Sequence, residues 1–352
     1  MKISIIIPVY NASKTIRRAI ASIDTLQNYE IICINDGSTD DSKDVIEKLQ
    51  KEYNYITLIN QENKGAAASR NEGLAHMTGD VFMFLDADDE FLTSRIDFMA
   101  NYYQKNEDVD IVLGQIAKGK YGDWQPIYTH KEIQKLEKVT LAQCPDMMQS
   151  IGPGGKMFSA RFADLRFDED VVFCEEHRFI IKAYQEARNI QLLPNMVYGY
   201  NEVEGSVTHQ RAEQFEAYML DALKVRTRVM DILSSNDERT YYSYRMDNLI
   251  VSYLLQAYIE KNNVITEKLL NTVSMYIKTM QKTDYSGDAM FRIVKVVEQG
   301  SKKWSKPLYQ QWREVLHSVG IGRPNYYRFK VEVLPKRAKL RGKMKLKHYL
   351  KR

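Results

Sequence analysis

The first hundred residues alternate between strand-like and helix-like patterns, and this alternation limits the possible folds more than any other feature. Residues 3–9 form a nearly continuous apolar, β-branched run, which is typical of a strand buried on both faces. Apolar residues then recur at helical spacing over residues 16–23, and further strands are expected over residues 30–35, 55–59 and 81–85. Short connections between such units predict a doubly wound α/β sheet of parallel strands with helices on both faces.

The rest of the chain has a different character. One more strand is expected over residues 111–114, and residues 118–145 follow no clear period. Residues 175–186 predict a helix, and from residue 212 the chain is rich in helix-forming residues, with no proline before Pro307. We therefore expect an α/β domain over residues 1–211, whose first half (1–115) is regular and whose second half (116–211) is less so, a helical region over 212–334 and a basic tail over 335–352.

Charge is unevenly distributed along the chain. The formal net charge is +4, yet the tail between Lys336 and Arg352 holds nine lysine and arginine residues and no acid, so the remainder carries −5. A mildly acidic body argues against a nucleic-acid partner. The tail could instead contact an anionic membrane surface or another polyanion, and the alternative is a disordered, solubilising end.

The cysteine content and the hydropathy of the chain indicate where it works. The three cysteines, Cys33, Cys144 and Cys174, form no CxxC pair, which argues against a disulfide framework and favours a reducing compartment. No run approaches the roughly 20 apolar residues needed to span a bilayer. We therefore expect a cytoplasmic protein that can lie peripherally on the inner face of the membrane.

Three carboxylates directly follow an apolar strand, at Asp86, Asp88 and Asp89. In an open parallel sheet, ligands bind beyond the carboxyl ends of the strands. Two carboxylates separated by one residue can hold a hard divalent cation, which also accepts oxygens from a diphosphate. The alternative is a solvated acidic turn that caps the next helix.

Other strand ends carry polar residues of the same kind. Asp36, in the segment NDGSTD, could accept a hydrogen bond from a nucleobase, and Tyr10, in PVYN, could stack on it. Arg70, in NKGAAASRN, could bind a phosphate through its planar fork of donors. The alternatives are a capped turn for Asp36, a packing aromatic for Tyr10 and a surface-covering side chain for Arg70.

Taken together, PVYN, NDGSTDDS, NKGAAASRN and FLDADD, in this order and at these spacings, resemble the inverting family 2 glycosyltransferases of GT-A fold. The resemblance is greatest to the enzymes of wall teichoic acid, capsule and exopolysaccharide synthesis. It implies a metal-dependent enzyme that transfers a hexose or an N-acetylhexosamine from a UDP-sugar to a polysaccharide or polyol-phosphate acceptor. It also implies that residues 1–211 form the catalytic domain, with a nucleotide-binding half over 1–115 and an acceptor half over 116–211. The residues that it places around the donor are Pro8, Tyr10, Asp36, Asn63, Arg70, Asp86, Ala87 and Asp88.

The same resemblance implies a Mn²⁺ or Mg²⁺ ion at the acidic motif. Asp88 would ligate the ion directly, and Asp86 would face the ribose and the metal-bound diphosphate. His209 resembles a histidine that some relatives place on the metal or the diphosphate, where it would add a nitrogen ligand. The alternative is a histidine in a surface loop.

An inverting transfer also needs a base for the acceptor hydroxyl. The resemblance points to the acidic pair Glu175 and Glu176, of which Glu176 matches the base; Glu at this position, where Asp is common, leaves the choice between them open. Acids at a helix N-terminus are also favoured by the helix dipole alone. The loop over residues 152–155 resembles the one before the acceptor site, so Lys156 is expected near an anionic group.

Two other functions fit part of the pattern. A sugar nucleotidyltransferase would use a similar fold and metal, but PVYNAS stands where its glycine-rich basic loop would be expected. A non-catalytic, membrane-associated scaffold would rest on the helical region and the tail, and the intact acidic motifs argue against it. The helical region is also where self-association into a homo-oligomer would be expected.

Overall fold

The computed structural model describes residues 1–120, 122–201, 214–250, 266–280, 293–294, 297 and 305–318. These residues belong to two compact units, residues 1–206 and residues 207–352. Each unit is described by itself.

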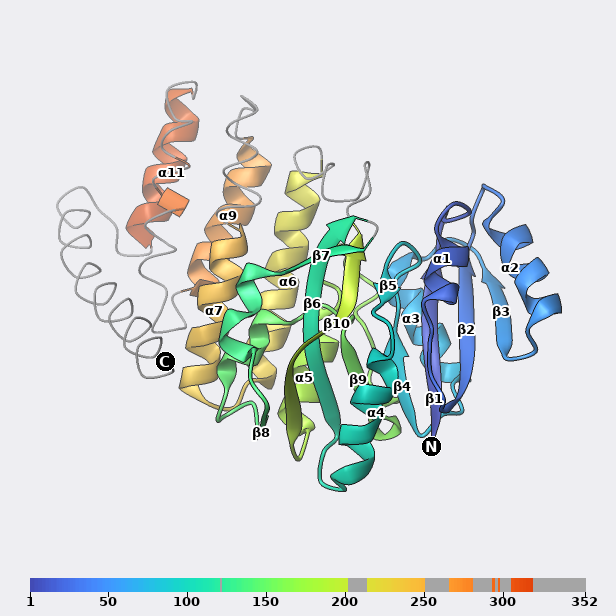
Figure 1. The fold of residues 1–352 in the computed structure, drawn as a ribbon. Helices are drawn as coiled ribbons and strands as arrows, with labels where there is room; N and C mark the ends of the chain where they lie inside the picture. The colour runs from blue at the N-terminus through green and yellow to red at the C-terminus, as the bar shows by residue number, and fades with distance from the viewer. Residues whose placement is uncertain are drawn as a thin grey trace. The chain divides into compact units, whose positions relative to one another are not determined.

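A ten-stranded mixed sheet forms the centre of the first unit (Figure 1). Its strands follow the order β3-β2-β1-β4-β9-β6-β10-β5, with β7 paired to β6 and β8 paired to β10. The four strands predicted near the N-terminus are neighbours and run parallel, with Ile5 opposite Ile31 and Ile3 opposite Val81. The strands are β1 (Lys2–Val9), β2 (Asn28–Asp36), β3 (Ile56–Gln61), β4 (Val81–Phe84), β5 (Glu90–Phe91), β6 (Ile111–Lys120), β7 (Asp123–Pro126), β8 (Glu137–Val139), β9 (Lys156–Ser159) and β10 (Ile190–Asn201).

Two strands of the second half depart from the regular parallel sheet predicted, one in its direction and the other in its register. β9 lies between β4 and β6 and runs antiparallel to both. β10 runs parallel to β6, but its register shifts between Leu192 and Tyr198, where Pro194 has no amide hydrogen for the ladder. Irregularities of this kind bend a strand and redirect its side chains.

Helices cover both faces of the sheet. Ile5 and Ile7 of β1 share an apolar cluster with Met99 of α4, whereas the intervening Ile6 faces α3, where a side chain at Gly73 would collide with it. Because alternate residues of a strand point to opposite faces, α4 covers one face and α3 the other (Figure 1). The helices are α1 (Ile16–Ala21), α2 (Ser42–Glu52), α3 (Gly65–His76), α4 (Arg95–Lys105) and α5 (His177–Glu186).

The segment predicted to follow no clear period contains more structure than expected. β6 continues to Lys120, and β7 folds back on it as a hairpin. β8 pairs with β10, a partner about fifty residues away that no local pattern could reveal. Short 3₁₀ turns connect these strands, over Tyr128–Ile133, Pro145–Gln149 and Ala160–Phe162.

The second unit is helical in its described parts, which confirms the predicted helical C-terminal region. In its core the buried guanidinium of Arg226 binds Asp247 at 2.9 Å, and the hydroxyl of Tyr276 donates to the same carboxylate at 2.8 Å. No helix among the described residues is long and apolar enough to cross a membrane. The basic tail, 335–352, lies outside the described residues. The helices are α6 (Phe215–Ile232), α7 (Asn236–Leu249), α9 (Glu267–Met280) and α11 (Lys306–Ser318).

Candidate active site

The predicted donor residues lie along one edge of the sheet. β1, β2 and β4 are parallel, so their carboxyl ends meet at that edge, with Tyr10 after β1, Asp36 at the end of β2 and Asp86 after β4. Tyr10 is 53% exposed, which leaves its ring accessible to a ligand. Pro8 lies within β1, and Ala87 is buried between the two aspartates of the acidic motif.

Asp36 holds the start of α3. Its carboxylate accepts hydrogen bonds from the backbone amides of Lys64 and Gly65, both at 2.8 Å, and from the Gln61 side chain at 2.7 Å. The next residue, Gly37, has φ +68°, and a Cβ there would lie 2.8 Å from the backbone nitrogen of Asn63. The glycine therefore allows the β2 end and the Asn63 loop to approach closely.

Arg70 joins the two predicted halves of the site. Its Nη2 lies 3.0 Å from Asp86 Oδ1, and its Nη1 lies 3.2 Å from Glu175 Oε1. The guanidinium also lies over the ring of Phe167, 5.4 Å from its centroid. Burial lowers the pKa of Arg70, but Asp86 and Glu175 outweigh that effect and raise it above its ordinary value, so the side chain stays charged. The sequence predicts that Arg70 binds a phosphate, whereas in the structure its guanidinium binds one carboxylate from each half of the site.

The acidic motif is fixed by residues of β10. The Tyr198 hydroxyl accepts a hydrogen bond from the Asp86 amide at 3.1 Å and donates one to Asp89 Oδ2 at 2.9 Å. The Asn201 amide donates to the other Asp89 oxygen at 2.9 Å. Burial raises the pKa of Asp89, and the charges of Asp86 and Asp88 raise it further. Asp89 is thus a structural acid that anchors the turn.

Asp88 is the carboxylate best suited to a cation. It is partly buried, and no side chain or amide of another described residue donates a hydrogen bond to it. Burial raises its pKa, and the charge of Asp86 raises it further. A divalent cation would neutralise these carboxylates and prefers their oxygens as ligands. Among the described residues no three His, Cys, Asp or Glu side chains form a group that could hold a metal ion.

Glu175 and Glu176 lie at the N-terminus of α5, with Glu176 as the residue before its first turn. The preceding Cys174 has φ +64°, a left-handed turn that changes the direction of the chain before the helix. Burial raises the pKa of Glu175, Glu176 raises it further and Arg70 opposes them. His177 Nε2 lies 3.9 Å from Glu176 Oε1.

Lys156 is fully buried beneath the loop that precedes it. Its Nζ donates to the carbonyls of Gly152 at 2.5 Å and Gly154 at 3.2 Å, and it lies 2.9 Å from the Ser150 hydroxyl. Burial lowers its pKa to about 7, and the charge of Glu176 partly opposes this. The expected anionic neighbour is therefore present in Glu176, although the direct partners of Lys156 are loop oxygens.

Comparison with known proteins identifies the family. The sequence profile described as Glycosyl transferase family 2 matches residues 4–167. TagX of Staphylococcus aureus (strain MRSA252), which carries a provisional glycosyltransferase name, is 33% identical over 353 residues, covering 99% of this chain and all of TagX. The chain belongs to glycosyltransferase family 2.

Other relatives agree with this family. The poly(ribitol-phosphate) beta-glucosyltransferase of Bacillus spizizenii is 31% identical over 209 residues, which cover 57% of this chain and 32% of that protein. The crystal structure of S. aureus TarS 1-349 with UDP-GlcNAc superposes with a TM-score of 0.69 at 19% identity, covering 88% of this chain and 92% of that one. The predicted family, the GT-A fold and the glycosyltransferase class are confirmed.

The structure brings together some predicted site residues and adds others. Arg70, Asp86 and Glu175 form one charged cluster, and the end of β2 at Asp36 lies close to the loop that carries Asn63. His209 lies outside the described residues. Tyr198, Asn201 and Phe167 were missed, because they reach the site from strands and loops whose contacts are distant in sequence.

Proposed function

We propose that this glycosyltransferase moves a hexose or an N-acetylhexosamine from a UDP-sugar to a polyol-phosphate polymer of the cell surface, with inversion and with a divalent cation. The observation that carries the proposal is the Arg70 bridge, which holds an acid of the donor edge, Asp86, and an acid of the acceptor half, Glu175, on one side chain. The named activity of the Bacillus relative and the UDP-GlcNAc bound to TarS support the choice of substrates.

The donor would lie along the carboxyl edge of the sheet. Tyr10 would stack on the uracil, and Asp36 and Asn63 would line the nucleoside end. Asp88, assisted by Asp86, would hold Mn²⁺ or Mg²⁺, with His209 as a further candidate ligand. When bound, the cation supplies positive charge for the departing diphosphate.

The transfer is a single displacement at the anomeric carbon. The acceptor hydroxyl oxygen forms a bond to C1 while the bond from C1 to the diphosphate oxygen breaks, and UDP leaves with the electron pair. Glu176 takes the hydroxyl proton. A base of this kind contributes roughly 10²–10⁴-fold to the rate. Because Arg70 already pairs with Glu175, we assign Glu175 the role of positioning residue and keep it as the alternative base.

The remainder of the chain supports this activity in our proposal. Residues 1–211 would form the catalytic domain, and residues 212–334 a helical region that allows self-association. The nine cations of residues 335–352 would draw the enzyme to an anionic membrane surface or to its anionic acceptor, each contributing about 1 kcal/mol near such a surface. We place the enzyme in the cytoplasm, on the inner face of the membrane.

The proposal is tested by donor turnover. Purified enzyme is incubated with a panel of UDP-sugars and a polyol-phosphate polymer, with Mn²⁺, with Mg²⁺ or with EDTA, and released UDP is measured. We expect one or a few UDP-sugars to be used, with loss of turnover in EDTA and in Asp88→Ala. Asp41→Ala, which removes an exposed carboxylate before α2, should leave turnover unchanged. Full turnover in EDTA, or release of pyrophosphate from UTP instead, would overturn it.

A further inference from the structure

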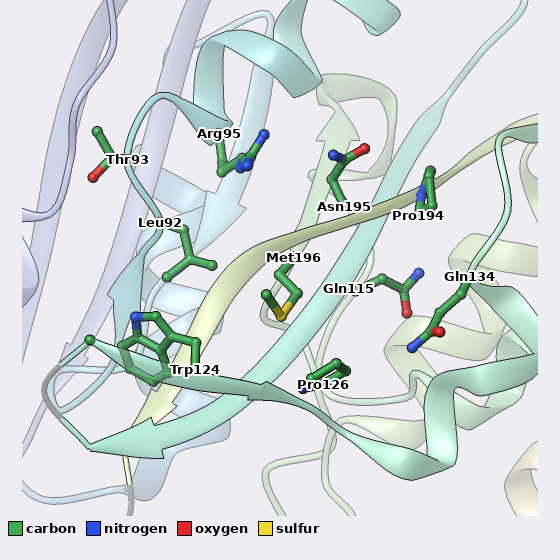
Figure 2. A pocket seen from close by; sticks show the side chains of 11 residues that line it. Leu92, Thr93, Arg95, Gln115, Trp124, Pro126, Gln134, Pro194, Asn195 and Met196 are labelled. Carbon is green, nitrogen blue, oxygen red and sulfur yellow. The ribbon is translucent and has the colours of Figure 1, made fainter.

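A pocket of about 670 Å³ lies in the first unit (Figure 2). Its lining residues include none of the charged cluster Arg70, Asp86 and Glu175. Its walls come from the start of α4, from β7 and from the irregular stretch of β10 that contains Pro194. α4 covers the sheet face opposite α3, which carries Arg70. None of the lining residues is a predicted donor or catalytic residue, and none is acidic.

The polar groups of this pocket have unused hydrogen-bonding capacity. Arg95 forms no ion pair with any described carboxylate, and the side-chain amides of Gln134 and Asn195 have no partner among the described residues. These three groups line a cavity large enough for a small ligand. A cation with no counter-charge among the described residues, in the same pocket as two amides with no described partner, favours a ligand that is both anionic and rich in hydroxyl groups.

Gln115, in the buried wall of the pocket, also has a polar atom whose hydrogen-bonding capacity is not used by a described residue. Its side chain is 1% exposed, and its Nε2 donates to the carbonyls of Ile133 at 3.1 Å and Leu193 at 2.8 Å. These two bonds fix the orientation of the amide. The remaining atom, Oε1, is buried and accepts no hydrogen bond from a described residue. A buried acceptor without a donor is costly, so this wall of the pocket is incompletely satisfied in the described structure.

The apolar part of the pocket suits a carbohydrate as well. The ring of Trp124 is partly exposed and lines the pocket with Pro126 and Met196 (Figure 2). An aromatic ring binds the C–H face of a sugar or polyol while leaving its hydroxyls free for amides. Arg95 adds a guanidinium, whose fork of donors matches a phosphate.

We propose that this pocket binds a phosphate-linked sugar or polyol unit of the acceptor polymer, other than the unit whose hydroxyl reacts. The inference rests on the proposed acceptor class and names a second place where that acceptor is held. Trp124 stacks on the carbon skeleton, Gln134 and Asn195 bind hydroxyls, and Arg95 binds the phosphate. Binding at two places would keep a long polymer on the enzyme between encounters with donor.

The test measures binding directly. A poly(glycerol phosphate) hexamer is titrated into the full-length protein in the presence of UDP and Mn²⁺, with neutral maltohexaose as the comparison ligand. We expect the hexamer to bind more tightly than maltohexaose, and its Kd to rise at least tenfold in Arg95→Gln and in Asn195→Ala. Arg17→Gln, which removes the same charge from an exposed site on α1, should leave the Kd unchanged. Thermal unfolding confirms that the variants are folded.

Three results would overturn the inference: no binding of the hexamer by wild type, an unchanged Kd in both pocket variants, or equal binding of maltohexaose that does not depend on Arg95. A transfer assay separates this second-site inference from the proposed function.

In that assay we expect Arg95→Gln to raise KM for the polymer about tenfold, with kcat and UDP-sugar hydrolysis unchanged. Arg95-dependent hexamer binding by an enzyme that transfers no sugar to such polymers would contradict the proposed function alone.

Discussion

The hydroxyl of Tyr198 lies 2.9 Å from Asp89 and links this buried acid to the backbone of Asp86. We expect Tyr198→Phe to leave Asp89 without one donor and to release the turn that carries Asp86 and Asp88. Loss of this bond should lower the unfolding free energy by about 1–2 kcal/mol. It should also lower kcat about tenfold, as measured by UDP release at saturating donor.

Tyr276→Phe is the matched control for this change. It removes a buried tyrosine hydroxyl that donates to a buried aspartate, Asp247, in the second unit. We expect a similar loss of stability with kcat unchanged. Equal kcat losses in both variants would mean that Tyr198 acts only through general stability.

The two acids before α5 should respond differently to neutralisation. We expect Glu176→Gln to keep the Kd for UDP-sugar within about twofold and to lower transfer by 10²–10⁴-fold, because only proton removal is lost. Glu175→Gln removes one of the two negative partners of Arg70, so transfer should fall less and donor affinity should change as well. Transfer rates and calorimetric donor affinities distinguish the two. Retained transfer in Glu176→Gln would reassign the base.

Gly37→Ala probes the close approach of β2 to the Asn63 loop. Alanine would have to adopt φ +68° with its Cβ 2.8 Å from a backbone nitrogen, so we expect a loss of about 1–3 kcal/mol. KM for the UDP-sugar should rise because Asn63 is displaced. Gly152→Ala, where a Cβ would meet no atom within 4 Å, should change stability by less than about 0.5 kcal/mol. Chemical denaturation of both variants checks this, and equal stabilities would refute the strain.

Lys156 predicts a pH dependence of stability. Burial lowers its pKa to about 7 in the folded chain, whereas an unfolded lysine titrates near 10.4. Between these values the unfolded chain binds more protons, so the lysine's contribution makes the unfolding free energy rise with pH. Between pH 7 and pH 10 this contribution raises the unfolding free energy of the wild type by about 2–4 kcal/mol, and we expect Lys156→Met to lack that increase. Denaturant curves for both proteins at the two pH values measure it; parallel pH profiles would contradict the burial effect.

Local patterns in the sequence predict the donor half of the molecule well. The β-branched run of β1 and the helical spacing of α1 are patterns among residues that are close in sequence. The same local patterns predict where each strand ends. Since parallel strands bring their carboxyl ends together, the placement of Tyr10, Asp36 and Asp86 on one edge could be foreseen.

The acceptor half could not be predicted in the same way. β10 is interrupted by Pro194 and loses a strand's regular pattern, although it is one of the longest strands of the sheet. The pairing of Arg70 with Glu175 joins residues 105 positions apart. Lys156 is polar by type yet fully buried, and only its three oxygen partners explain this. The pairing of Arg70 with Glu175 depends on a contact distant in sequence, for which a single sequence carries no local signal. The oxygen partners of Lys156 are two to six residues away, but they surround it only once that loop has folded.

The length of α3 fixes the distance between Asp36, at one end of the site, and the carboxylates of Asp86 and Glu175 that Arg70 binds. The Asp36 carboxylate accepts hydrogen bonds from the amides of Lys64 and Gly65 at the start of the helix. Arg70 lies about 7.5 Å further along the helix axis than Gly65. One residue inserted between Gly65 and Arg70 would swing the guanidinium by about 100° away from both carboxylates. The outward-facing side chains of this segment can therefore vary during evolution, but its length cannot.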